Sequence, residues 1–141
     1  MTDLTGRCEC GAVAYRSEGP WRDIITCHCQ ECRRQSGHYW AATAVPKDAL
    51  EMVEARGLRW IRMSDMAERG FCAKCGSGVF YRPDHKGYVA IGAGTLDDTN
   101  GLTHIEEVFV AEAGDYYPLA GDVPRHEAFS AAWKSKDGAG A

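Results

Sequence analysis

The chain has 141 residues, with 16 lysines and arginines against 20 aspartates and glutamates, and a formal net charge of −4. Proteins that bind nucleic acid gain affinity by neutralising phosphates with basic side chains, so this balance argues against a nucleic-acid partner. No stretch approaches the roughly 20 apolar residues of a membrane span, which argues against a membrane protein.

Short segments with strand character, separated by glycine, proline and aspartate, make up most of the chain. In chain order they cover residues 13–17, 24–26, 39–45, 58–63, 78–82, 88–92 and 106–110. The runs YWAATAV and GYVAIGA are apolar on both faces, which is typical of central strands in a sheet. Helical signals are weak: one turn is predicted over 31–36 and two turns over 125–133, with a turn at 45–50. The pattern predicts a mainly β fold with little helix.

The chain is expected to form one domain over residues 1–133, because this length suits a single hydrophobic core. Residues 134–141, KSKDGAGA, are small and polar and predict a disordered tail.

Seven cysteines provide the main functional signal. The amino terminus lacks the apolar run of a signal peptide, so we expect a cytoplasmic protein, in which structural disulfides are rare. An odd number of cysteines also does not suit a closed disulfide framework. Their close spacing therefore favours metal binding. They fall into the motifs Cys8-Glu-Cys10-Gly, Cys27-His-Cys29-Gln-Glu-Cys32 and Cys72-Ala-Lys-Cys75-Gly.

The seven thiols divide naturally into four and three. Four ligands close a structural zinc site, whereas three ligands with an open position describe a catalytic one. Cys27, Cys29 and Cys32 form the only local triplet, so they are the candidates for the open site. The four candidates for the closed site are Cys8, Cys10, Cys72 and Cys75. Zinc suits such soft ligands, with iron–sulfur as the other candidate.

A zinc ribbon built from two Cys-x-x-Cys pairs is the simplest alternative. It would combine Cys29 and Cys32 with Cys72 and Cys75. The gap between these pairs far exceeds the roughly 15–20 residues of the usual ribbon, and three cysteines would remain unused.

The open site predicts a particular chemistry. Three thiolates donate so much charge that a bound zinc would generate hydroxide poorly, but it could hold a fourth, exogenous thiol in its deprotonated form. Such a site suits the delivery of a small-molecule thiol to an electrophilic carbon.

The motifs that carry these cysteines resemble a known family. GRCECGAVAYRSEGP, CHCQECRRQSG and FCAKCGSGVFYR are similar to the three motifs of the glutathione-dependent formaldehyde-activating family, also called S-(hydroxymethyl)glutathione synthases. The later segments GTLDD, HIEEVFV and YY…GDVPRHE extend the resemblance, which covers about residues 6–127. It implies a β-tent-type zinc fold of several short coiled sheets around cysteine knuckles, related to that of centromere protein V.

The resemblance also implies ligands, cofactor and reaction. Each chain would hold two zinc ions, a structural one on Cys8, Cys10, Cys72 and Cys75 and a catalytic one on Cys27, Cys29 and Cys32. Glutathione would bind the catalytic zinc through its sulfur and add to formaldehyde, a reaction classed as that of a carbon–sulfur lyase. A non-catalytic thiol carrier and a zinc-stabilised interaction module are the alternatives.

Some other residues have two readings. His28 could be a metal ligand, but its neighbours should point the opposite way, which favours a supporting or exposed position. Arg33 and Arg34 could anchor the carboxylates of glutathione or form a solvated surface pair. The isolated histidines not expected to be ligands are His38, His85, His104 and His126. The aromatic residues expected in the core rather than in a pocket are Tyr39, Trp40, Phe80 and Tyr81.

Overall fold

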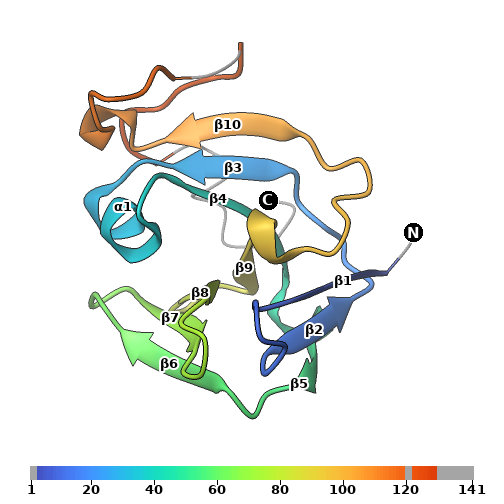
Figure 1. Cartoon of the computed structure of the whole chain (residues 1–141). Helices are drawn as coiled ribbons and strands as arrows, with labels where there is room; N and C mark the ends of the chain where they lie inside the picture. The colour runs from blue at the N-terminus through green and yellow to red at the C-terminus, as the bar shows by residue number, and fades with distance from the viewer. Residues whose placement is uncertain (1–2, 120–121, 130–141) are drawn as a thin grey trace.

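Two β-sheets carry most of the described chain, which comprises residues 3–119 and 122–129 of a computed structural model (Figure 1). The smaller sheet has the strand order β1-β2-β5, with bounds Leu4–Arg7, Ala14–Ser17 and Glu51–Glu54. The larger sheet has the order β10-β3-β4-β9-β8-β7-β6. In chain order its strands are β3 (Ile24–Cys27), β4 (Trp40–Pro46), β6 (Leu58–Arg62), β7 (Ala67–Cys72), β8 (Gly78–Pro83), β9 (Tyr88–Gly92) and β10 (His104–Val108).

The described residues contain one short α-helix, α1 (Gln30–Ser36). It begins after Cys29, whose sulfur accepts a hydrogen bond from the Cys32 amide, and ends at Gly37 in the left-handed conformation that glycine favours. The described residues also form the 3-10 turns η1 (Lys47–Ala49), η2 (Ala93–Thr95) and η3 (Val110–Glu112). The expectation of a mainly β fold with little helix is confirmed. Within the described ranges, no helix has the length and apolar character needed to cross a membrane.

The sequence missed three strands and misplaced one helix. Strands β1, β5 and β7 were not predicted, since their short sequences LTGR, EMVE and AERGFC contain charged residues, and two of them also contain a glycine. The predicted strand 106–110 begins earlier, at His104, and ends at Val108 because Phe109 adopts a positive φ of 58°. Residues 125–129 form a β-bridge and bends instead of the predicted helix. Residues 130–133 of that helix and the predicted tail 134–141 lie outside the described ranges.

The larger sheet curls around its central strands. β4 and β9 are neighbours at its centre, as their apolar character predicts, and β9 is buried along its whole length. In Figure 1, β3 and β10 lie above α1, whereas β6 and β7 lie below it. The curl brings β7 to the helix, where Arg69 bonds to Glu31 and Cys32.

The parallel pairing of β10 with β3 positions the segment that follows β10. Val108, the last residue of β10, lies opposite Cys27, the last residue of β3. The chain beyond Val108 therefore runs beside the chain beyond Cys27. This places residues about 80 positions apart in sequence next to one another.

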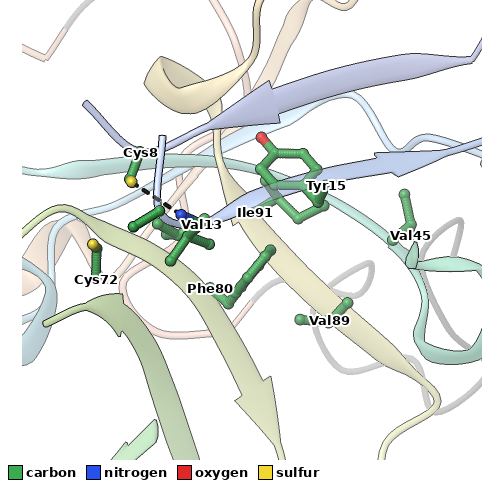
Figure 2. Close-up of a cluster of buried hydrophobic side chains, with 10 residues drawn as sticks. Cys8, Val13, Tyr15, Val45, Cys72, Phe80, Val89 and Ile91 are labelled. Atoms are coloured by element: carbon green, nitrogen blue, oxygen red, sulfur yellow. Dashed lines mark hydrogen bonds between the residues drawn. The ribbon is translucent and has the colours of Figure 1, made fainter. Parts of the chain in front are cut away.

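Each cysteine group belongs to a different part of the hydrophobic core. Figure 2 shows the first part, in which Tyr15, Phe80 and Ile91 pack together near Cys8 and Cys72. The second part contains Ile25, Trp40, Val108, Cys27 and Cys32. The same packing that stabilises the fold therefore positions the four buried cysteines, which are Cys8, Cys27, Cys32 and Cys72.

Candidate metal centres

The first centre joins two turns that are far apart in sequence. The ligand atoms of Cys8, Cys10, Cys72 and Cys75 all lie within 4.8 Å of one another. The sulfur of Cys10 is 3.8 Å from that of Cys8 and 3.7 Å from that of Cys72. A tetrahedral ion with zinc–sulfur distances of about 2.3 Å would separate its sulfur ligands by about 3.8 Å. The four cysteines therefore fit one metal ion.

Local backbone conformation explains how both turns present their sulfur atoms. Gly11 and Gly76, which follow Cys10 and Cys75, have positive φ values of 83° and 84°, a conformation in which a side chain would be strained. In the first turn, the amide of Val13 donates a hydrogen bond to the Cys8 sulfur at 3.3 Å (Figure 2). Amide donors aimed at a sulfur favour its thiolate form, which is the form that binds metal.

Gly57 packs closely against the Cys72 sulfur of this centre, so a side chain at this position should disturb the centre. An added Cβ would lie 2.8 Å from both the Cys72 sulfur and the Ala12 Cβ. We expect Gly57→Ala to reduce the free energy of unfolding by about 1–3 kcal/mol, as overpacking does, and to weaken metal retention at this centre. Thermal unfolding and chelator competition measure the two effects. Gly94→Ala is the matched control, because its Cβ would meet nothing within 4 Å. Equal behaviour of the two variants would contradict the prediction.

The second centre forms where β3 leads into α1. Cys27 ends β3, Cys29 precedes the helix and Cys32 lies in its first turn. The three sulfur atoms lie within 4.8 Å of one another, and no other described histidine, cysteine or carboxylate belongs to this group. The three side chains fit one ion and provide three of its ligands.

Crowding of the three thiols also favours a bound cation. The neighbouring Cys29 and Cys32 side chains, together with burial, raise the pKa of Cys27. Hydrogen bonds from Cys27 and Cys32 lower the pKa of Cys29 to about 2. One thiolate thus opposes ionisation of the next, because like charges at this distance repel. A divalent cation among the sulfur atoms would remove that conflict.

A cavity of about 190 Å³ opens onto the second centre, and all three of its cysteines line it. Its apolar lining includes Trp40, Phe109 and Phe129. Met66 and Tyr81 line both this cavity and an adjoining one of about 410 Å³. The second centre is therefore accessible to a small molecule that can also contact apolar surface.

Arg69, on β7, brings a positive charge to the second centre. Its side chain is 4 % exposed; Nη2 donates to the Cys32 sulfur at 3.3 Å, and Nε donates to Glu31 Oε2 at 2.7 Å. The central carbon of its guanidinium lies 5.3 Å from the ring centroid of Trp40 and 4.9 Å from that of Tyr81. These distances allow cation–π attraction to both rings.

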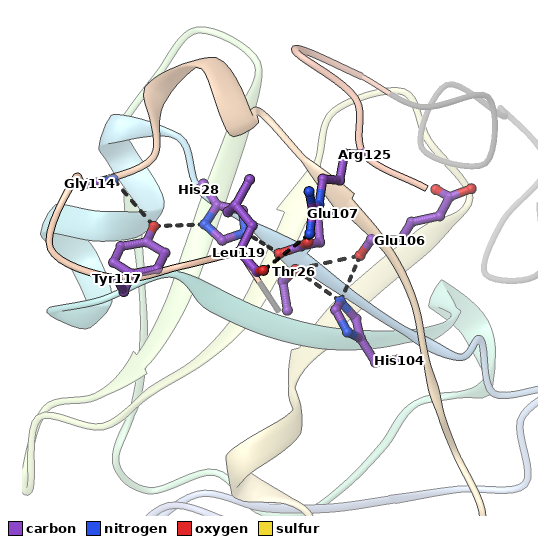
Figure 3. Close-up of polar contacts among 9 residues, drawn as sticks. All are labelled: Thr26, His28, His104, Glu106, Glu107, Gly114, Tyr117, Leu119 and Arg125. Atoms are coloured by element: carbon purple, nitrogen blue, oxygen red, sulfur yellow. Dashed lines mark hydrogen bonds and ion pairs between the residues drawn. The ribbon is translucent and has the colours of Figure 1, made fainter. Parts of the chain in front are cut away.

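His28 lies between Cys27 and Cys29 in the sequence, and its ring is held by Glu107 of β10, the strand that pairs in parallel with β3. Burial lowers its pKa, so the ring is neutral near pH 7. Its Nδ1 pairs with the Tyr117 hydroxyl at 2.7 Å, and its Nε2 pairs with Glu107 Oε1 at 3.0 Å (Figure 3). A neutral ring satisfies both bonds when Tyr117 donates to Nδ1 and Nε2–H donates to the carboxylate. Arg125 Nε donates to the second oxygen of Glu107 at 3.3 Å.

These positions correct several expectations. The zinc-ribbon alternative is wrong, because Cys29 and Cys32 lie in one group and Cys72 and Cys75 in the other. His28 supports the site as expected, but it is 1 % exposed rather than at the surface.

The basic and aromatic residues also differ in part from expectation. Arg33 and Arg34 do not line the cavity over the second centre, whose arginine is Arg69. Phe80 lies in the core as predicted. Trp40 and Tyr81 pack against the core and also line the cavity. Tyr39 lines a separate cavity that also contains His28.

The most important residues that sequence reasoning missed are Arg69 and Glu107. Both are charged residues within strands, and nothing in their local sequence distinguishes them from surface residues such as Arg59. Glu107 does follow another glutamate in an otherwise apolar segment, but the identity of its partner depends on the parallel pairing of β10 with β3.

Fold and site together define a mainly β protein with two all-cysteine clusters that could each bind a metal ion. The family model described as "glutathione-dependent formaldehyde-activating enzyme" (GFA) matches residues 3–112. The chain therefore belongs to the GFA family. It is 25 % identical over 122 residues to an uncharacterized lyase of Schizosaccharomyces pombe, covering 85 % of this chain and 88 % of the relative. A crystal structure of a Rhodobacter sphaeroides protein has a similar fold, with a TM-score of 0.59, 22 % identity, and coverage of 86 % of this chain and 98 % of that one.

Proposed function

We propose that the protein is a zinc-dependent enzyme of the carbon–sulfur lyase type, which adds a glutathione-like thiol to formaldehyde or a related small carbonyl compound. The observation that carries the proposal is the cavity over three cysteines, which leaves one position of a tetrahedral ion open to a ligand. Membership of the GFA family supports the same chemistry. The proposal includes two zinc ions per chain and a cytoplasmic location, where the cysteines would remain reduced.

The residues of the two centres have different roles in this proposal. Cys8, Cys10, Cys72 and Cys75 would hold a structural zinc ion, and Cys27, Cys29 and Cys32 a catalytic one. When bound, the catalytic zinc supplies a cationic position at which a thiol loses its proton. The thiol sulfur forms a bond to the carbonyl carbon, the carbonyl π electrons move to oxygen, and the oxygen takes up a proton. Trp40 and Phe109 would provide an apolar wall beside the place where this bond forms, since both line the cavity.

Calorimetry with glutathione tests the proposal. Because the site takes the thiolate, binding should release a proton, and affinity should rise about tenfold per pH unit below the thiol pKa of roughly 8.5. S-methylglutathione keeps the carboxylates and amides but cannot ionise at sulfur, so we expect it to bind much more weakly. Measurements in buffers of different ionisation enthalpy count the released protons.

Cys29→Ser serves as the control, because loss of one of three ligands should abolish pH-dependent binding. Equal affinity for glutathione and S-methylglutathione, without proton release, would reject thiol capture at this centre. Steady-state kinetics against the uncatalysed reaction then separates an enzyme from a carrier. A rate equal to the spontaneous one, with binding intact, would favour the carrier.

A further inference from the structure

Electrostatic balance at the second centre requires a positive charge from the protein. A divalent ion with three thiolates has a net charge of −1, and a fourth thiolate would make it −2. Cys27 and Cys32 are each only 3 % exposed, so water solvates the charge on these two sulfur atoms poorly. A buried net charge is costly unless an opposite charge or hydrogen bonds compensate for it.

Arg69 is placed to provide that compensation. It contacts the Cys32 sulfur directly and lines the cavity in which a fourth ligand would sit. Its other contacts hold it in one orientation: Glu31 accepts from Nε, and the rings of Trp40 and Tyr81 lie close to the guanidinium. Since Nε is occupied by Glu31, the Nη end of the guanidinium faces the metal ligands.

We propose that Arg69 is the charge-balancing residue of the second centre and makes it select anionic fourth ligands, thiolates above all, over neutral ones. This inference rests on the proposed function and deepens it, because it explains why the site would capture a thiol as its anion. Arg69 acts on the fourth ligand indirectly, through its hydrogen bond to the Cys32 sulfur and through its charge beside the cavity. It is therefore a positioning residue and not a catalytic one. Glu31 has a subsidiary role, in that it orients Arg69 but partly offsets its charge.

The test compares ligands of different charge on the full chain loaded with cobalt, whose absorption bands report the coordination of the metal. Azide and glutathione serve as anionic ligands, and imidazole serves as a neutral one. A charge-assisted hydrogen bond is worth about tenfold to a hundredfold in affinity. We therefore expect Arg69→Gln to weaken azide and glutathione binding by about that factor and to leave imidazole binding nearly unchanged. Arg69→Lys, which keeps the charge, should restore most of the preference for anions.

Two further variants separate charge from folding. Arg82 is also an arginine of the larger sheet, with its guanidinium carbon 3.7 Å from the Trp60 ring centroid and an ion pair to Glu68. Arg82→Gln should leave the affinity for both the anionic and the neutral ligands unchanged. Glu31→Gln keeps an acceptor for Arg69 but removes a negative charge, so it should strengthen azide binding. If Arg69→Gln does not fold, Arg69→Lys decides the question: a retained preference for azide over imidazole supports the role of the charge, and a lost preference contradicts it.

The outcomes distinguish this inference from the proposed function. The role of Arg69 would be overturned if Arg69→Gln weakened azide binding and imidazole binding equally, or weakened neither. Thiol capture would remain intact in both cases. If the unaltered protein binds azide but not glutathione, the proposed function fails, and the ratio of azide to imidazole binding still decides the role of Arg69. Absence of any ligand binding by the cobalt-loaded protein would overturn both.

Discussion

A Cys72→Ser substitution is expected to leave the chain unfolded or insoluble. Cys72 is fully buried in the first part of the core, and its sulfur lies 3.7 Å from that of Cys10. A structural zinc ion can contribute on the order of 10 kcal/mol to folding in small domains, which is comparable with the whole stability of a typical protein, about 5–15 kcal/mol. Circular dichroism, solubility and zinc content per chain measure the outcome.

Cys32→Ser is the matched control for this prediction. Cys32 is also buried, at 3 % exposure, but it belongs to the second centre. We expect this variant to stay folded, to lose the metal of the second centre and to retain about one zinc ion per chain, as a four-ligand site holds its ion more firmly. Equal loss of structure in Cys32→Ser and Cys72→Ser would contradict the proposal that the first centre is structural and the second is not.

A Glu107→Ala substitution is expected to cost about 1–3 kcal/mol of stability, the penalty for leaving a buried hydrogen-bond donor without its acceptor. The carboxylate is 3 % exposed and accepts hydrogen bonds from both His28 and Arg125. Its loss would leave the buried Nε2–H of His28 without its acceptor. Since His28 lies between Cys27 and Cys29, the second centre should also lose affinity for metal.

Denaturant unfolding and chelator competition measure these two effects. Glu107→Gln keeps an acceptor of the same shape and should show a smaller loss of stability. Glu106→Gln, at the preceding position of β10, is the control, since its side chain does not bond to His28. A Glu107→Ala protein as stable as Glu106→Gln would contradict a structural role for the His28–Glu107 pair.

The cysteine groups could be predicted from the sequence because their geometry is largely local. Two cysteines followed by a glycine define a turn, and the positive φ values of Gly11 and Gly76 agree with that reasoning. The triplet needs only the end of one strand and the start of one helix. Central strands were equally predictable, since β4 and β9 are apolar on both faces.

The residues around the second centre could not be predicted because their positions depend on the order of strands in the sheet. Arg69 reaches Cys32 only because the sheet curls, and Glu107 reaches His28 only because β10 joins β3 in parallel. The sequence left a supporting and an exposed position of His28 both open, because its burial depends on the same pairing. At 125–129, pairing of Arg125 with Glu107 overrides a weak local preference for helix.

The two centres also differ in when they can assemble during synthesis. Cys10 and Cys72 are 62 positions apart, so at about 5–20 residues per second the ribosome needs roughly 3–12 s to deliver the second half of the first centre. The loss of chain entropy makes closing a loop of this length about 2 kcal/mol less favourable in free energy than closing the short loop from Cys27 to Cys32. Cys27, Cys29 and Cys32 are therefore all synthesised before Cys72 and Cys75, the partners of Cys8 and Cys10. The centre that would stabilise the fold would therefore be the last to bind an ion, and its first two thiols would have to stay reduced until then.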